Sequence, residues 1–110
     1  MSEPRPMLMV FTAPVPGREV EYHRWYDEIH LDEILALPGF VGARRYDFSP
    51  AGVRGAAEPP TGNLAVYELQ GDPAAAVQAL VAARATLQLS DALADGADVW
   101  LFNPREPKAS

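Results

Sequence analysis

The chain has 110 residues, a length that suits one domain with one hydrophobic core. Its formal net charge of -6, with no clustered basic stripe, argues against binding to nucleic acids and to anionic membranes, because both need a basic surface that neutralises phosphate groups. The absence of cysteine excludes disulfides, thiolate metal sites and a cysteine nucleophile.

The first residues predict neither a leader nor a membrane anchor. The apolar run 7–13 ends at Pro14 and is far shorter than the roughly 20 residues that a membrane-spanning helix needs. We therefore expect a cytoplasmic protein with a flexible N-terminal arm over residues 1–6, one domain over residues 7–104 and a C-terminal tail over residues 105–110.

The first strand and the first helix follow in order. The proline-bounded residues Met7–Ala13 predict a buried strand, and residues Arg18–Leu37 carry a helical pattern. At about 100° per residue, one sector of this helix holds the side chains of Tyr22, Trp25, Tyr26, Ile29 and His30.

The helical pattern changes phase near its middle. In a straight helix, Leu31 and Leu35 would fall on the polar side. We therefore expect a kink near Leu31–Asp32, with Asp32 as the N-cap of a new turn. Pro38–Gly39 then ends the helical segment.

Two strands joined by a long loop come next. Residues Phe40–Phe48 alternate, with Phe40, Gly42, Arg44, Tyr46 and Phe48 on one face and Val41, Ala43, Arg45 and Asp47 on the other. The loop Ser49–Thr61 is a candidate lid, a dimer contact or simply a mobile segment. Residues Asn63–Leu69 predict the strand that completes the hairpin.

The last helix and strand complete the domain. Asp72–Pro73 predicts an N-cap and first position for a helix over Ala74–Leu87, and Ala97–Asn103 predicts a fourth strand. The order β-α-β-β-α-β is that of an α+β ferredoxin-like fold with a four-stranded antiparallel sheet. Because both helices would cover one face, we expect a homodimer that buries the apolar side chains of the open sheet face.

Residues Tyr22–Phe40 (YHRWYDEIHLDEILALPGF) carry a recognisable pattern. It resembles the signature W-Y-x-x-x-H-L-P-x-x-L-x-x-P-G-F of the EthD-like proteins in the dimeric α/β-barrel superfamily. The matching positions are Trp25, Tyr26, His30, Leu31, Leu35, Pro38, Gly39 and Phe40, and Arg45–Tyr46 follows as it commonly does. The departure is Asp32, where proline is frequent, and both residues suit the start of a helical turn.

The resemblance implies a dimeric α/β barrel without implying one reaction. The superfamily includes cofactor-free oxygenases, polyketide cyclases, muconolactone isomerases and dehydratases, and haem handling is known among relatives with this topology. Since a fold does not determine a function, the reaction has to be argued from the residues.

His30 is the first candidate catalytic residue. A histidine near its free pKa of about 6.5 accepts or donates a proton at neutral pH, which a cyclisation or an isomerisation requires. The alternative is a histidine at a helix end that bonds a carbonyl group and holds the kink.

Aromatic side chains accompany this histidine on the same stripe. Tyr22 and Tyr26 are candidate catalytic residues, because phenols at this spacing could orient a polar aromatic substrate or stabilise an enolate. The alternative is a packed core whose hydroxyls are satisfied. Trp25 is a candidate substrate-binding residue at the edge of the stripe, and His23 points about 100° away from Tyr22, into solvent.

Two arginines on the second strand point to opposite faces. One of Arg44 and Arg45 therefore faces a buried region, where an unpaired charge is costly. It would pair with a carboxylate such as Glu68 or Asp98, or bind an anionic substrate group. We count Arg44 and Tyr46 as candidate substrate-binding residues.

The sequence predicts no cofactor. His23, Asp27 and His30 have a spacing that permits a metal site, but the chain has no further histidine and we predict none. The acidic pairs Asp27–Glu28 and Asp32–Glu33 are expected on a solvated helix face. No phosphate-binding glycine loop, dinucleotide fingerprint or serine nucleophile elbow occurs.

These observations favour a small cofactor-independent enzyme that acts on a hydrophobic, oxygenated small molecule. The reaction would be a cyclisation, isomerisation or oxygenation of a polyketide-like or aromatic compound, with His30 as acid or base. The alternative is a non-catalytic small-molecule-binding or accessory dimeric protein. A cavity filled by the protein's own side chains would favour this alternative.

Overall fold

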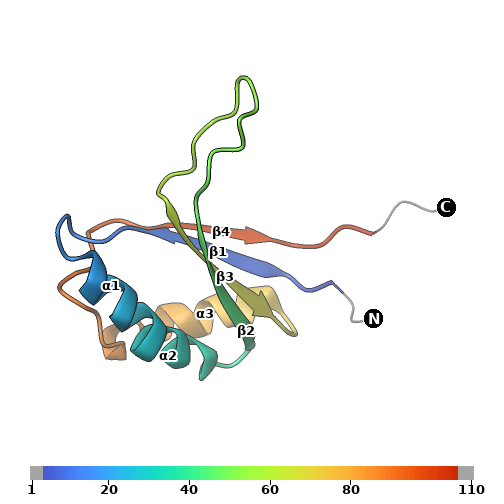
Figure 1. The fold of residues 1–110 in the computed structure, drawn as a ribbon. Helices are drawn as coiled ribbons and strands as arrows, with labels where there is room; N and C mark the ends of the chain where they lie inside the picture. Colours follow the sequence, from blue (N-terminus) through green and yellow to red (C-terminus); the bar gives the residue numbers. More distant parts are fainter. Residues whose placement is uncertain (1–3, 107–110) are drawn as a thin grey trace.

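The computed structural model describes residues 4–106, so parts of the expected arm and tail lie outside the described residues. Strands β1 (Met7–Thr12), β2 (Phe40–Asp47), β3 (Asn63–Leu69) and β4 (Asp98–Phe102) form one antiparallel sheet in the order β2-β3-β1-β4. All helices lie on one side of this sheet (Figure 1). The predicted α+β ferredoxin-like fold is therefore confirmed.

One continuous helical segment connects β1 to β2. It consists of α1 (Glu19–Trp25), a π-helical turn (Tyr26–His30) and α2 (Leu31–Leu35), and the backbone angles of Tyr26, His30 and Leu31 are all right-handed helical. The expected kink at Leu31–Asp32 and the Asp32 N-cap are therefore wrong, because Asp32 lies inside α2. The change of phase occurs one turn earlier, where the π-helical turn accommodates an additional residue.

The π-helical turn keeps one stripe of side chains against the sheet. Between Tyr22 and Ile34, a regular α-helix would rotate about 120° beyond whole turns. The wider turn absorbs this rotation, so Tyr22, Tyr26 and Ile34 are all buried. The same shift turns Ile29 outward, against expectation, and leaves it 38% exposed.

The second helical segment begins at the predicted cap. Helix α3 (Pro73–Ala83) starts at Asp72, whose carboxylate accepts a hydrogen bond from the Ala74 N–H, and it is followed by a 3-10 turn over Arg84–Thr86. No helix within residues 4–106 is long and apolar enough to cross a membrane.

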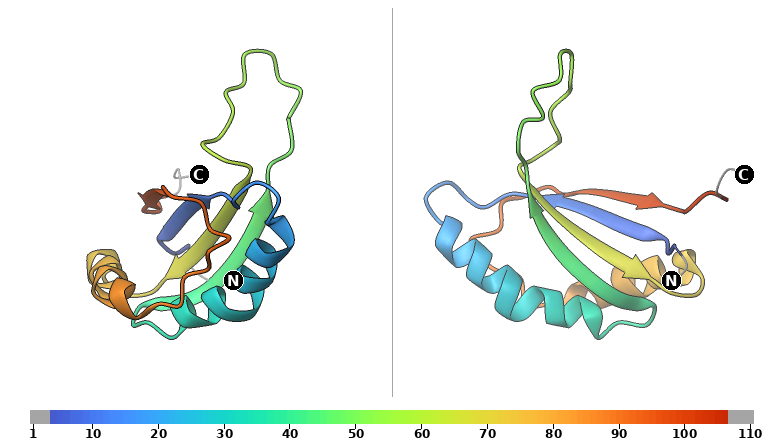
Figure 2. Two further views of the ribbon diagram at one scale, coloured as in Figure 1. Left: turned by 90° about the vertical axis from the view of Figure 1, so that its left-hand side faces the viewer. Right: turned by 45° about the vertical axis from the view of Figure 1, so that its right-hand side comes forward.

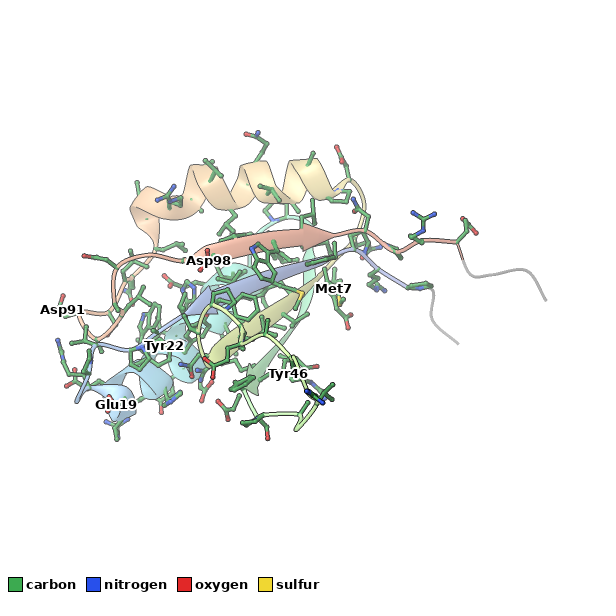
Figure 3. The ribbon with its side chains drawn as sticks, turned by 90° about the horizontal axis from the view of Figure 1, so that it is seen from above. Met7, Glu19, Tyr22, Tyr46, Asp91 and Asp98 are labelled. Carbon is green, nitrogen blue, oxygen red and sulfur yellow. The ribbon has the colours of Figure 1, made fainter. Side chains whose placement is uncertain are left out.

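The two faces of the sheet differ in what covers them. Leu8, Ala65 and Tyr67 face the helices and are buried in the core. The strand register places the following apolar side chains on the opposite side, which we call the outer face: Met7, Met9, Phe11, Tyr46, Leu64, Val66, Trp100 and Phe102. Figure 3 looks onto this face, with Met7 and Tyr46 labelled.

A bulge changes the face of one predicted residue. The register of β2 against β3 shifts between Phe40 and Gly42, so Phe40 joins the core while Gly42, Arg44 and Tyr46 keep the outer face. The expected common face for Phe40 and these residues is therefore wrong, because a bulge inserts one residue and reverses the alternation.

The loop between β2 and β3 extends away from the sheet on the side opposite the helices (Figures 1 and 2). In this arrangement it does not cover the aromatic stripe of α1, so the structure does not place it as a lid over His30.

Gly39 lies where α3 packs closely against the turn before β2, so a substitution there tests this packing. Its φ is +88°, and an added Cβ would lie 2.9 Å from the Ala76 Cβ of α3, whereas Gly71 has a φ of +82° with no atom within 4 Å of an added Cβ. Gly71→Ala should cost about 1–2 kcal/mol of unfolding free energy from backbone strain alone. Gly39→Ala should cost a further ~1–3 kcal/mol through overpacking. Urea unfolding followed by circular dichroism measures both, and equal losses would contradict the close packing of α3 at this position.

Candidate functional site

The helical stripe brings the predicted catalytic side chains together. The ring centroids of Tyr22 and Tyr26 lie 5.6 Å apart, and those of Tyr26 and His30 lie 5.0 Å apart. Trp25 stacks on His30 at 4.5 Å with an interplanar angle of 24°. Three predicted catalytic residues and one predicted substrate-binding residue therefore form one aromatic cluster under the sheet.

Phenols from the helix and the sheet meet beneath β1 and β3. The Tyr22 hydroxyl shares a 2.6 Å hydrogen bond with the Thr12 hydroxyl. Tyr67, which the sequence did not single out, lies beside Tyr26, and its buried hydroxyl has no hydrogen-bond partner among the described residues. Burial raises the pKa of both Tyr26 and Tyr67, because a phenolate is poorly solvated there. Both phenols therefore stay protonated near neutral pH.

Arg45 is the arginine that faces the buried side. Its guanidinium carbon lies 4.4 Å from the centroid of the Tyr26 ring, a cation–π distance, and one nitrogen lies 3.0 Å from Asp27 Oδ1. Another nitrogen lies 2.9 Å from His23 Nδ1, so His23 does not simply point into solvent. The charge is thus paired as expected, but by Asp27 of the helix.

The expected partners of Arg45 lie on the wrong side of the sheet. Glu68 is in register with Met7, and Asp98 with Phe11, so both carboxylates belong to the outer face. Arg45 cannot reach them, because alternation turns its side chain toward the helices.

The contacts of His23, Asp27 and His30 do not leave these three side chains free to bind a metal ion together. Arg45 places a cation between His23 and Asp27, while the His30 ring packs against Trp25. Within residues 4–106, no three histidine, aspartate or glutamate side chains form a group that could hold a metal ion.

His30 contacts a carboxylate that the sequence placed in solvent. Its Nδ1 lies 3.7 Å from Glu33 Oε1, and the side chains of His30 and Glu33 are only 14% and 21% exposed. The expectation of a solvated Glu33 is therefore wrong. Burial lowers the pKa of His30, and the negative charge of Glu33 opposes this shift without cancelling it. The imidazole is consequently neutral at pH 7 and able to accept a proton.

The remaining predicted substrate-binding residues lie elsewhere. Arg44 and Tyr46 are on the outer face, so the sheet separates them from His30. Tyr46 lines an open cavity of about 380 Å³ at the base of the β2–β3 loop, together with Phe11, Phe48 and the carboxylate residues Asp47 and Glu58. A second cavity of about 280 Å³ lies near Met7 and Phe102, and neither of these two cavities reaches His30.

Comparison with known proteins supports the fold. No protein-family model and no curated protein matches the sequence. Among solved structures, the chain is similar to the crystal structure of a "putative monooxygenase" from Shewanella loihica, with a TM-score of 0.59 and 19% sequence identity over 96% of this chain and 100% of the other. The two proteins share the fold. Membership of the EthD-like proteins stays a prediction.

The Thr12–Tyr22 hydrogen bond tests whether the buried phenols hold the stripe against the sheet. Thr12→Val and Tyr22→Phe should each lower the free energy of unfolding by about 1–3 kcal/mol, because each leaves a buried hydroxyl unpaired. The double variant should lose less than the sum of the two, since it removes both groups. Chemical denaturation of the four proteins measures this cycle, and strictly additive losses would show that the two hydroxyls do not interact.

Proposed function

We propose that this protein is a small cofactor-independent enzyme that acts on a hydrophobic, oxygenated small molecule, with His30 as its general base. The observation that carries the proposal is the environment of His30. A neutral, partly buried imidazole lies in a π-helical turn between an aromatic ring and a carboxylate. π-helical turns are frequent at functional sites.

The cluster suits proton abstraction from a polyketide-like or aromatic compound. A ring nitrogen of His30 takes a proton from an O–H or an activated C–H bond, and the electron pair of that bond stays on the substrate as a phenolate or enolate. A substrate that enters the stripe would be oriented by the phenols of Tyr26 and Tyr22 and would meet the flat ring of Trp25, so its binding requires these buried side chains to move apart. The anion then cyclises, isomerises or, with molecular oxygen as a co-substrate, is oxygenated. The similar Shewanella protein is described as a "putative monooxygenase", which supports oxygenation among these reactions.

One observation favours a second candidate function. Tyr22 and Tyr26 are 0% and 2% exposed, so the protein's own side chains fill the stripe beside His30. The open cavity lies on the outer face instead, and its volume of about 380 Å³ falls within the range of small-molecule sites. The second candidate is therefore a non-catalytic binding or accessory protein that holds a hydrophobic ligand beside Tyr46.

His30→Gln tests the enzyme proposal. A panel of hydroxylated polycyclic ketones and phenols is offered without added cofactor, and product formation is followed by mass spectrometry and oxygen uptake. The variant should lose turnover by roughly 10²–10⁴-fold, the usual contribution of a general base, with a nearly unchanged melting temperature. In the wild type, turnover should fall with acid at a midpoint below about 6.5, because only the neutral imidazole accepts a proton and burial lowers its pKa.

Tyr46→Ala supplies the matched control. It removes an aromatic ring from the outer face and should leave turnover by the helical site in place. If Tyr46→Ala abolishes ligand binding while His30→Gln changes neither binding nor chemistry, the binding protein replaces the enzyme. A large loss of thermal stability in His30→Gln would instead assign His30 a structural role.

We further propose that the chain forms a homodimer through the outer face. This face exposes large apolar side chains from several strands, including Trp100 at 42% and Phe102 at 50%, and a soluble monomer rarely tolerates such a patch. Every residue of the edge strand β4 is exposed as well.

A charge on this face should break the dimer. Trp100→Glu is expected to give a monomer in light scattering at micromolar concentration, because a carboxylate buried between two sheets is unsolvated. Val20→Glu is the control, since Val20 is 73% exposed on α1, on the helical side of the sheet. A wild type that is monomeric at every concentration would contradict the dimer.

A further inference from the structure

Two buried polar atoms face each other beside the aromatic cluster without a hydrogen bond. His30 Nδ1 and Glu33 Oε1 lie 3.7 Å apart, and neither has a hydrogen-bond partner among the described residues. Buried polar atoms are normally paired, because an unpaired one loses the hydrogen bonds that water would supply. Each of these atoms is therefore the best available partner of the other.

Gln88, in the segment after α3, hydrogen-bonds two of the residues that contact the His30 ring. The N–H of Gln88 donates to Glu33 Oε2 at 2.8 Å, and the carbonyl oxygen of the same residue accepts from Trp25 Nε1 at 2.6 Å. Trp25 in turn stacks on the His30 ring. The backbone of Gln88 alone thus fixes the Glu33 carboxylate at one edge of the His30 ring and the Trp25 indole on its face.

We infer that Glu33 is a positioning residue that selects the tautomer of His30. A carboxylate offers only acceptors, so a neutral imidazole that faces it turns its single N–H toward it. The proton then lies on Nδ1, and Nε2, on the other side of the ring, is left with a free lone pair. The catalytic consequence rests on the proposed function, because Nε2 would be the atom that takes the substrate proton.

Few groups other than Glu33 can influence which nitrogen of His30 carries the proton. The titratable residues that contact the ring are Tyr26, from the π-helical turn, and Glu33, from α2. Tyr26 is uncharged at neutral pH because burial raises its pKa. The segment after α3 contributes the backbone of Gln88, which carries no charge. Glu33 is therefore the one charged group facing the ring from these elements.

The tautomer can be measured without any substrate. The chain has only two histidines, so a long-range proton–nitrogen spectrum of the ¹⁵N-histidine-labelled protein resolves both rings, and His23, which contacts Arg45, serves as the internal reference. We expect His30 to carry its proton on Nδ1 in the neutral form. A wild type with the proton on Nε2 would overturn the inference, whether or not any variant folds.

The variant Glu33→Gln provides a second test of the His30 tautomer. Its amide oxygen can keep the hydrogen bond from Gln88, so its NH₂ group would face His30 and the proton should move to Nε2. The pKa of His30 should also fall further, because the variant removes the charge that raises it. Glu28→Gln is the matched control, because it makes the same substitution at an exposed glutamate of the same helical segment. An unchanged His30 spectrum in Glu33→Gln would overturn the inference.

Kinetics then separate this inference from the proposed function. With an active substrate, Glu33→Gln should lower kcat much more than it changes KM, because the wrong tautomer binds substrate but cannot accept its proton. If the tautomer reverses as expected and no substrate is turned over by the wild type, Glu33 still positions His30 and the enzyme proposal fails alone. If turnover requires His30 but is unaffected by Glu33→Gln, the enzyme stands and the positioning role is wrong.

Discussion

The phase of one helical segment is the constraint on which the rest of the structure depends. Tyr22, Tyr26 and Ile34 must all face the sheet, and a regular α-helix cannot keep side chains at a spacing of four residues on one side for three turns. The π-helical turn over Tyr26–His30 supplies the missing rotation. Without it, Ile34 would lie about 120° around the helix from Tyr22 and would leave the face that packs against the sheet.

Two polar groups contact the Tyr26 ring, and each solves a problem of burial. The Arg45 charge is paired with Asp27 and contacts the Tyr26 ring. His30 stays neutral because burial disfavours the imidazolium more than Glu33 favours it. A partly buried imidazole that is uncharged at neutral pH, with protonated phenols close by, is an arrangement that proton transfer can use.

The sheet divides the molecule into two candidate ligand regions with different properties. The helical side holds the proposed base His30 but is filled by its own side chains, whereas the outer face is open, carries many apolar side chains and is hollowed beside Tyr46. A second copy of the chain on the outer face would cover this hollow as well as the exposed aromatic side chains. The similarity to a solved structure at 19% identity fixes the architecture common to both proteins and leaves the choice between these regions to the side chains.

Local patterns in the sequence determined the strands, the Asp72 cap and the clustering of Tyr22, Tyr26 and His30, because alternation, capping and helical spacing act over a few residues. They also revealed the phase mismatch, but local capping preference assigned it to Asp32 and not to the π-helical turn. Only the tertiary structure decided that Asp27 pairs with Arg45 and that Gln88 holds Glu33 beside His30. Glu33 and Gln88 are 55 residues apart, and no short-range preference of the chain specifies which backbone N–H a carboxylate meets at that separation.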